Sequence, residues 1–381
     1  MRSLRFWKPT ESFFVLEILP NKVNGLLLGL DADQKLTPRK FFEDTDWAHL
    51  SKRLDLRRLV KNIIVAVDSS LAYTAIIPVS LQRESSGRPL SAVELENLLA
   101  QEVGKLFNQC RQDASAYLKV DDLDVILVNS RVMNFKIDGH RVLNPLEFRA
   151  TKIEAVLELI LTTRAVFSDI KIFTKERQDL FFTEIARSEL NVLQKVHDAP
   201  LSILHLGEEE SAYAVLESLA LGQTVARGRF PWTTGTLVRS LESAWLINFE
   251  TAEVIYRMYV DGELTPTTGK AVQKILAPAE KSIYTALAAT KFRGPVFVES
   301  DRPLPFRLPL KKYGRNLMPP PLDELFERFG FRIDWKEWTM GRESVFRLLA
   351  PFWDYYYDRS DSTVNRWLKR HLNWLGTGLI P

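Results

Sequence analysis

The side chains best suited to chemistry lie in residues 201–221, where a short polar turn separates two apolar segments. Gly207, three consecutive glutamates and Ser211 make up this turn. Glycine lets backbone N–H groups approach an anion closely, but three adjacent glutamates repel a polyphosphate. The turn therefore keeps one glycine of the kind that an anion site needs, and it has the wrong charge for such a site.

Two β-hairpins are the elements that must position these residues. Apolar residues run from Leu201 up to the turn and then resume in a partly alternating pattern, which predicts a strand, a turn and a second strand. Residues 13–30 repeat this plan near the N-terminus, and their turn carries Asn21 and Lys22 after Glu17. Two hairpins of similar plan indicate a duplicated α/β fold.

This duplicated plan resembles the actin-like ATPase superfamily, in which two such turns face each other and hold the phosphates of ATP. The first family turn usually begins Asp-x-Gly, and Glu17 and Leu19 stand at those places. The second usually begins Asp-x-Gly-Gly-x-Thr, and this sequence has His205, Gly207 and, further on, Ser211. The resemblance implies that imidazole has replaced an acidic side chain that orients Mg²⁺ and water, and that most of the phosphate-binding glycines are absent.

Two further family signatures around the nucleotide are also altered. Trp232 and Thr233 replace a paired glycine that precedes a helix in the family. Glu299 and Ser300 follow a predicted buried strand, where the family has a glycine pair under the adenine. The family's nucleotide-binding signatures are thus altered at several places that should converge in space, which argues against a working nucleotide site.

A later family helix carries Ala-Glu-x-x-Lys near the ribose, and this chain keeps Ala252 and Glu253 but has Tyr256 in place of the lysine. Glu253 is either a retained ribose contact or a solvated helix residue, and we favour the solvated side chain. No catalytic residue, metal site or cofactor is expected, and ATP with Mg²⁺ is disfavoured. The resemblance implies these degenerate nucleotide-binding positions: Glu17, Asn21, Lys22, Gly207, Ser211 and Glu253.

Composition excludes several other classes of protein. The chain of 381 residues is long enough for two or more domains with sizeable cores. Its 46% hydrophobic and 26% charged residues are an ordinary globular composition. Lys and Arg exceed Asp and Glu by only 51 to 48, which does not indicate nucleic-acid binding. The lone Cys110 permits no internal disulfide, and the five histidines lack metal-ligand spacing. No signal peptide is expected, and no segment approaches the roughly 20 apolar residues of a membrane-spanning helix.

Residues 90–163 have a different pattern from the two halves. An amphipathic helix with N-cap chemistry comes first, and Asp138-Gly139 then reads as a two-residue hairpin turn between strands. Asn144-Pro145 and an alternating strand follow. This order resembles the inserted subdomain of FtsA, although the glycine usually found soon after Asn-Pro is absent. The alternative is a generic α+β hairpin domain.

Residues 360–375 are predicted to form a short amphipathic helix with an apolar stripe and a basic back. Helices of this composition lie in a membrane interface beside anionic lipid, and FtsA-family proteins end in such a helix behind a flexible link. The alternative is a last helix packed on the core. The residues predicted to contact the membrane are Val364, Trp367, Leu368, Leu372, Trp374, Leu375, Arg366, Lys369 and Arg370.

The predicted fold class is α/β, a duplicated, two-lobed actin-like (ribonuclease H-like) fold with an inserted α+β subdomain. Local patterns add four expectations: a loosely helical segment at 41–59, a lobe 1 strand at 71–79, a helix at 181–196 and an aromatic link at 353–358. The predicted segments are lobe 1 (1–82), the inserted subdomain (83–170), the return to lobe 1 (171–200), lobe 2 (201–350), and a C-terminal link with the amphipathic helix (351–381).

The resemblance to FtsA and to its pilus-assembly relative PilM implies a non-hydrolysing scaffold in the cytoplasm, peripheral on the inner face of the cytoplasmic membrane. Such a scaffold links a cell-division or envelope assembly to protein partners, binds the membrane surface through its C-terminal helix and can self-associate. One alternative is a PilM-like pilus or secretion assembly protein that binds a short peptide of a single-span membrane protein. Another is an active ATPase of the same fold. No nucleic-acid partner is expected.

Overall fold

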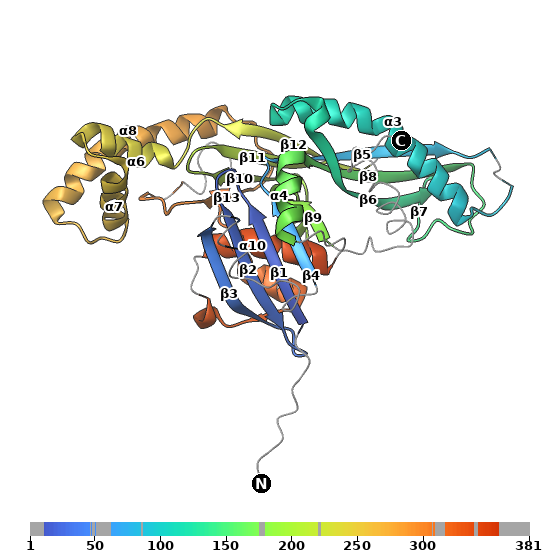
Figure 1. Cartoon of the computed structure of the whole chain (residues 1–381), viewed down its shortest axis with the longest axis horizontal. Coiled ribbons are helices and arrows are strands. Elements are labelled where there is room, and N and C mark those ends of the chain that lie inside the picture. The colour runs from blue at the N-terminus through green and yellow to red at the C-terminus, as the bar shows by residue number, and fades with distance from the viewer. Residues whose placement is uncertain are drawn as a thin grey trace, which may run out of the picture.

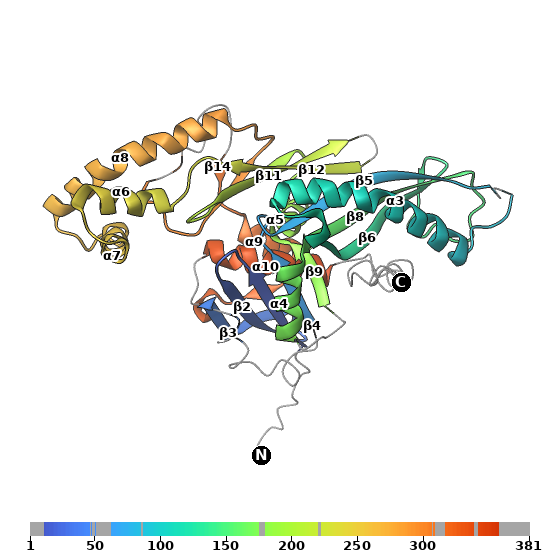
Figure 2. The same cartoon turned by 45° about the horizontal axis from the view of Figure 1, so that its top comes forward.

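The structure, a computed structural model, is a mixed α/β molecule whose described residues form three sheets. It describes residues 11–45, 47, 50, 62–84, 87–174, 180–219, 222–306, 308, 317–338 and 342–357. The sheet of β5, β6, β7 and β8 (residues 72–163) lies at one end of the long axis, and three helices lie at the other (Figure 1). Figure 2 shows the same separation from a second direction. These helices are α6 (Gly235–Trp245), α7 (Phe249–Val260) and α8 (Pro266–Ala289).

The first sheet, with the helices that cover it, is called lobe 1. Its strands are β1 (Glu11–Ile18), β2 (Val23–Leu30), β3 (Lys35–Thr45), β4 (Asn62–Val67), β9 (Leu180–Glu184) and β15 (Arg332–Ile333). They lie in the order β15-β3-β2-β1-β4-β9. β1 pairs antiparallel with β2 and parallel with β4. The central strands β1 and β4 are almost continuous apolar runs, as expected of strands that are covered on both faces.

The second sheet repeats this plan and is called lobe 2. Its strands are β10 (Leu201–Leu206), β11 (Ser211–Leu219), β12 (Gly222–Phe230), β13 (Val296–Ser300) and β14 (Leu317–Met318). β10 pairs antiparallel with β11 and parallel with β13, as β1 does with β2 and β4. The duplicated hairpins and the α/β fold class are therefore confirmed, and the carboxyl ends of β1, β4, β10 and β13 meet between the lobes.

The third sheet, with the order β5-β8-β6-β7, is called the insert sheet. Its strands are β5 (Ala72–Gln82), β6 (Val125–Ile137), β7 (His140–Arg141) and β8 (Lys152–Thr163). The long helix α3 (Ala92–Leu118) packs its apolar face on this sheet and is followed by the short turn η1 (Asp122–Asp124). The Asp138-Gly139 turn joins β6 to β7 as predicted. Ala72 pairs with Thr162, so the chain enters and leaves the sheet side by side.

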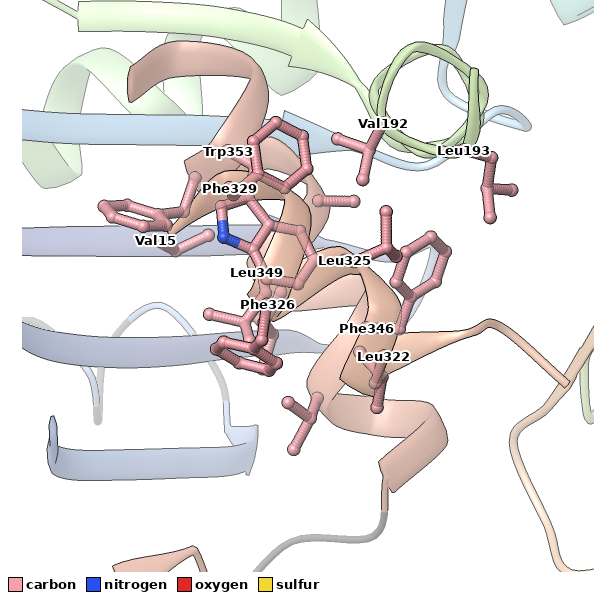
Figure 3. Packing of buried hydrophobic residues seen from close by; sticks show 14 of the residues in the cluster. Val15, Val192, Leu193, Leu322, Leu325, Phe326, Phe329, Phe346, Leu349 and Trp353 are labelled. Atoms are coloured by element: carbon pink, nitrogen blue, oxygen red, sulfur yellow. The ribbon is translucent and has the colours of Figure 1, made fainter. Parts of the chain in front are cut away.

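Aromatic side chains fill the core beside β1 and extend to lobe 2. Trp353 and Phe329 stack with ring centroids 5.3 Å apart, and Figure 3 shows them close to Val15 of β1. This core also includes Leu201 and Ile203 of β10, so one apolar cluster joins the two lobes. The remaining elements are α4 (Arg164–Thr174), α5 (Ile185–Leu193), α9 (Leu322–Phe329), η3 (Trp335–Glu337) and α10 (Arg342–Tyr356).

Three of the local expectations concern strands, and the structure corrects each of them. Residues 41–45 belong to β3 rather than to a helix, because they pair with β2. Trp47 and Leu50 are helical, and residues 51–59 lie outside the described part. Residues 71–79 were assigned to lobe 1, but β5 pairs along its length with β8 of the insert sheet. Residues 180–184 form β9 against β4 before α5 begins. Short apolar runs fit either a strand or a helix, and pairing decides between them.

The expected aromatic link at 353–358 is also wrong over its described residues. Trp353 is fully buried, and residues 353–356 form the last turn of α10. Asp354, taken as a linker acid, accepts hydrogen bonds from Ser188 Oγ (3.1 Å) and Asn191 Nδ2 (3.2 Å) of α5. Burial of the aromatic rings against α9 and β1 extends the helix beyond the predicted end.

Candidate interlobe site

The two hairpin turns meet between the lobes. In the first turn, the Leu19 N–H donates to the carbonyl oxygen of Lys22 over 3.0 Å. Asn21 Nδ2 then donates to Glu209 Oε2 of the second turn over 2.8 Å. The structure thus brings the predicted residues of both turns together, but the turns bind each other.

Two backbone N–H groups of the second turn are bound by side chains of the same chain. Gly207 N–H donates to Ser211 Oγ over 3.0 Å, and Glu208 N–H donates to Asp301 Oδ2 over 3.2 Å. A Cβ at Gly207 would lie 2.0 Å from the carbonyl oxygen of Glu210. Gly207 and Ser211 are therefore needed to build the turn itself.

The N-terminus of α6 is a second potential source of N–H donors. The N–H groups of Thr234 and Gly235 donate to carbonyl oxygens of the second turn over 2.9 and 3.1 Å. Trp232, which stands where the family has glycine, is buried, and its Nε1 donates to the Ala279 carbonyl oxygen over 3.0 Å. An indole ring occupies space that glycine would leave open.

Arg347 of α10 connects strand ends of both lobes. Its Nε lies 2.8 Å from Glu17 Oε1 on β1, and its Nη2 lies 3.5 Å from Asp68 Oδ2 after β4. On the lobe 2 side, its Nη1 lies 3.1 Å from Asp301 Oδ1 and contacts His205 Nε2. The His205 Nε2 in turn lies 2.9 Å from Asp301 Oδ1. A cation of the chain itself therefore bridges the two lobes.

Glu17, the first predicted nucleotide position, is occupied by contacts within the protein. It is buried, it is paired with Arg347, and its Oε2 accepts a hydrogen bond from Asn24 Nδ2 over 2.7 Å. The carboxyl group thus stabilises the junction between β1 and α10.

The electrostatics of the site divide its acids into two kinds. The His205 ring and the Arg347 guanidinium lower the pKa of Asp301 although burial opposes them. Burial raises the pKa of Glu189 on α5 to about 7, against the attraction of Arg347. Burial and the neighbouring Glu189 raise the pKa of Glu299 on β13 well above its usual value. Asp301 is thus held ionised, whereas Glu189 and Glu299 favour their protonated forms.

Glu253 is an ion-pair partner rather than the solvated side chain that we favoured. Its Oε1 accepts a hydrogen bond from Arg302 Nη1 over 2.8 Å, and Arg302 Nη2 lies 2.6 Å from Glu208 Oε1. Tyr256, in place of the family lysine, donates its hydroxyl to the Pro303 carbonyl oxygen over 2.6 Å. A pocket of about 200 Å³ beside this pair is lined by acidic and basic side chains together.

Sequence reasoning missed the residues that dominate the site: Arg347, Asp68, Glu189 and Asp301. One signal was present for Arg347, because it interrupts an otherwise apolar run on α10 whose neighbours Phe346 and Leu348 are buried. A charged side chain on a buried helix face requires a partner. The identity of that partner follows only from the tertiary structure.

Within the described residues, no group of three or more His, Cys, Asp or Glu side chains could hold a metal ion. No helix among these residues has the length and apolar character needed to cross a membrane. The membrane-contacting residues predicted between 364 and 375 lie outside the described part of the chain.

The chain resembles known proteins in its three-dimensional structure and not in its sequence. No family model matches the sequence, and no curated protein sequence matches it. A chain of the solved "PilM-PilN type IV pilus biogenesis complex" matches with a TM-score of 0.52 and 13% identity, over 96% of this chain and 99% of that chain. This chain has the actin-like fold.

Two further solved structures are more distant. The cytoplasmic domain of EpsL, an inner membrane component of the type II secretion system of Vibrio cholerae, gives a TM-score of 0.35 at 11% identity, over 84% of this chain and 94% of that domain. A Bacteroides thetaiotaomicron protein with an actin-like ATPase fold gives 0.37 at 9% identity, over 89% and 96% of the two chains. In this actin-like chain, the interlobe site lies at the two duplicated hairpin turns.

Proposed function

We propose that this chain is a non-hydrolysing scaffold of the actin-like fold whose lobes are held together by its own ion pairs instead of by a nucleotide. The observation that carries the proposal is the state of the second turn. The N–H groups of Gly207 and Glu208 donate to Ser211 and Asp301, and Glu209 binds the first turn. A polyphosphate would have to displace these contacts and enter beside several carboxylates, which repel it.

Arg347 supports the same proposal from the other side of the site. A nucleotide with its cation can hold two lobes together by binding to both of them. Arg347 makes comparable contacts without a nucleotide, through Glu17 in lobe 1 and Asp301 in lobe 2. The active ATPase alternative has no comparable support among the described contacts.

For the partners, the likeness to a chain of the PilM-PilN type IV pilus biogenesis complex favours a pilus- or secretion-type assembly over cell division. We propose that the partner is a short cytoplasmic peptide of an inner-membrane assembly protein, bound beside the insert sheet. β6 of that sheet and β9 of lobe 1 lie next to each other there, since Asn129 Nδ2 donates to the Phe182 carbonyl oxygen over 2.7 Å. The C-terminal helix would add membrane contact from the cytoplasmic side.

Calorimetric titration of the full chain with ATP and Mg²⁺ tests the nucleotide part of the proposal. We expect no saturable heat up to about 1 mM ATP, which corresponds to a binding free energy weaker than about 4 kcal/mol. Glu209→Gln is a matched variant, because it removes an exposed turn carboxylate and leaves the Arg347 ion pairs intact; it should also fail to bind. Micromolar affinity that Glu17→Gln abolishes would support the active ATPase instead.

The partner part of the proposal needs a separate titration. Synthetic peptides from the cytoplasmic segments of single-span membrane proteins encoded beside this chain would be added to the full chain, with and without ATP. We expect one peptide to bind with micromolar affinity and ATP to leave that affinity unchanged. Binding that requires ATP, or no binding by any of the peptides, contradicts the proposal.

The membrane part is tested by sedimentation with vesicles. The predicted helix should bring the full chain down with vesicles that contain anionic lipid. Trp367→Glu with Leu372→Glu should release it without lowering the melting temperature. If the double change lowers the melting temperature in the absence of lipid, the stripe faces the core.

A further inference from the structure

Two buried carboxyl groups face the interlobe site without a donor. Glu189 of α5 and Glu299 of β13 are 2% and 1% exposed. Among the described groups, none donates a hydrogen bond to Glu189 Oε1 or to either carboxyl oxygen of Glu299. A buried ionised carboxylate without a donor is strongly unfavourable, whereas a protonated carboxyl can donate to a neighbouring carboxylate. A direct contact between the side chains of Glu189 and Glu299 therefore requires a proton on one of them.

The surrounding charges do not remove this need. The Arg347 guanidinium faces the pair, and its nitrogens already lie against Glu17, Asp68 and Asp301. Most of the other neighbours are acidic and add to the repulsion of a negative charge. The titratable groups around the pair are Glu17 of β1, Lys22 of the first turn, Asp68 after β4, His205 of β10, Asp301 after β13 and Arg347 of α10.

Glu189 and Glu299 lie where α5, which continues lobe 1, packs against lobe 2 through β10. α5 follows directly from β9 of lobe 1, whereas β13 is a central strand of lobe 2. Both groups line one small cavity of about 20 Å³ with Ile203, His205 and Arg347. A change of charge here acts directly on the contact between the lobes.

We propose that Glu189 and Glu299 share a proton that holds the two lobes together, and that loss of this proton as the pH rises drives the lobes apart. This proton latch, formed by Glu189 and Glu299, involves no nucleotide and no partner. Deprotonation leaves two carboxylates in contact in a site where Arg347 is already fully engaged. Their mutual repulsion favours separation of α5 from β13.

The sign of the pH dependence follows from the pKa values. Burial raises the pKa of Glu189 to about 7 and that of Glu299 well above its usual 4.5. Between these values and the unfolded value, the folded protein binds more protons than the unfolded chain. The stabilisation is therefore complete below about pH 4.5 and is lost as the pH rises through the folded pKa values.

Unfolding by urea between pH 5 and pH 8 tests the latch by comparing wild type with Glu299→Gln. The glutamine amide donates a hydrogen bond at every pH and does not titrate. The variant should therefore lose the pH dependence of stability that Glu299 contributes. The ratio of the wild-type unfolding constant to that of the variant should rise about tenfold per pH unit between pH 5 and 7. Glu263→Gln, an exposed change after α7, should parallel wild type throughout.

Two further measurements protect the test against a variant that fails to fold. Glu189→Gln removes the other half of the pair and should change the ratio in the same direction up to about pH 7. In wild type, infrared spectroscopy should show a protonated carboxyl band at pH 6 that weakens by pH 9, while small-angle scattering shows an increased radius of gyration. Parallel pH profiles for wild type and Glu299→Gln, or no such band at pH 6, would overturn the proposal.

Discussion

The interlobe cluster around Arg347 and the cluster around Glu158 are both buried and both join separate sheets, but their charge balance differs. Arg347 is one guanidinium among five carboxyl groups. Glu158 of β8 lies instead between two arginines, with hydrogen bonds of 2.6 Å from Arg131 Nε and 2.6 Å from Arg187 Nε. Asp354 of α10 pairs with Arg131, so two cations face two anions.

This difference separates a structural junction from a responsive one. The Glu158 cluster ties the insert sheet to α5 and α10 with its charges matched, and the two arginines lower the pKa of Glu158 to about 2 although burial opposes them. No change near neutral pH alters its charge. The Arg347 cluster has more acids than its cation can neutralise, so its state depends on protons. The insert is thus fixed firmly, whereas the contact between the lobes can be adjusted.

The largest expected effect comes from Arg347→Met. The change leaves Glu17 and Asp301 beside the junction without their cation, and breaking a buried ion pair in this way costs about 3–5 kcal/mol. Urea unfolding at pH 7 measures the loss. Arg229→Met is the matched control, because Arg229 pairs with Glu210 at the surface and should cost no more than about 1 kcal/mol. Similar losses in the two variants would mean that the Arg347 cluster contributes no more to the free energy of unfolding than a surface ion pair does.

Glu158→Gln should have the next largest effect, about 3 kcal/mol at pH 7, because it leaves Arg131 and Arg187 with one carboxylate fewer. The contribution of Glu158 is complete above its unfolded pKa of about 4.5 and is lost as the pH falls to about 2. Urea unfolding should therefore show the variant approaching wild type as the pH falls from 4.5 to 2.

The control for this change is Glu154→Gln on the same strand, whose partner Lys152 is partly exposed. It should cost no more than about 1 kcal/mol and show no comparable convergence at low pH. If Glu158→Gln keeps its full deficit at pH 2, the two arginines do not stabilise the carboxylate, and the contrast between the clusters fails.

The two clusters also show what sequence reasoning can reach. The hairpins, the insert and the fold class were predictable because apolar periodicity and turn residues such as Gly139 are local signals. The sheet to which β5 belongs was not, since its partner strand β8 lies far along the chain and pairing is decided by tertiary contact.

The site was predictable only in outline. Glu17, Gly207 and Ser211 were located at the right turns, but the pattern of those turns carries no information about which side chains face them. Arg347 lies on a distant helix, and its role emerges only when α10 packs between β1 and β13. Local sequence therefore identifies the turns of an actin-like fold, whereas the neutralisation of their charges depends on contacts far apart in the chain.

The smallest expected effect is that of Asn21→Ala, which removes the direct contact between the two turns. Asn21 and Glu209 are both exposed, and water replaces a lost hydrogen bond at the surface, so we expect a change of no more than about 0.5 kcal/mol in the free energy of unfolding. The pH profile of stability should remain that of wild type, because the Glu189–Glu299 pair is untouched. Both quantities come from the urea series used for Arg347→Met. A loss above about 2 kcal/mol would show that the turns themselves hold the lobes together, and burial of the charges around Arg347 would then no longer explain why the interlobe junction is stable.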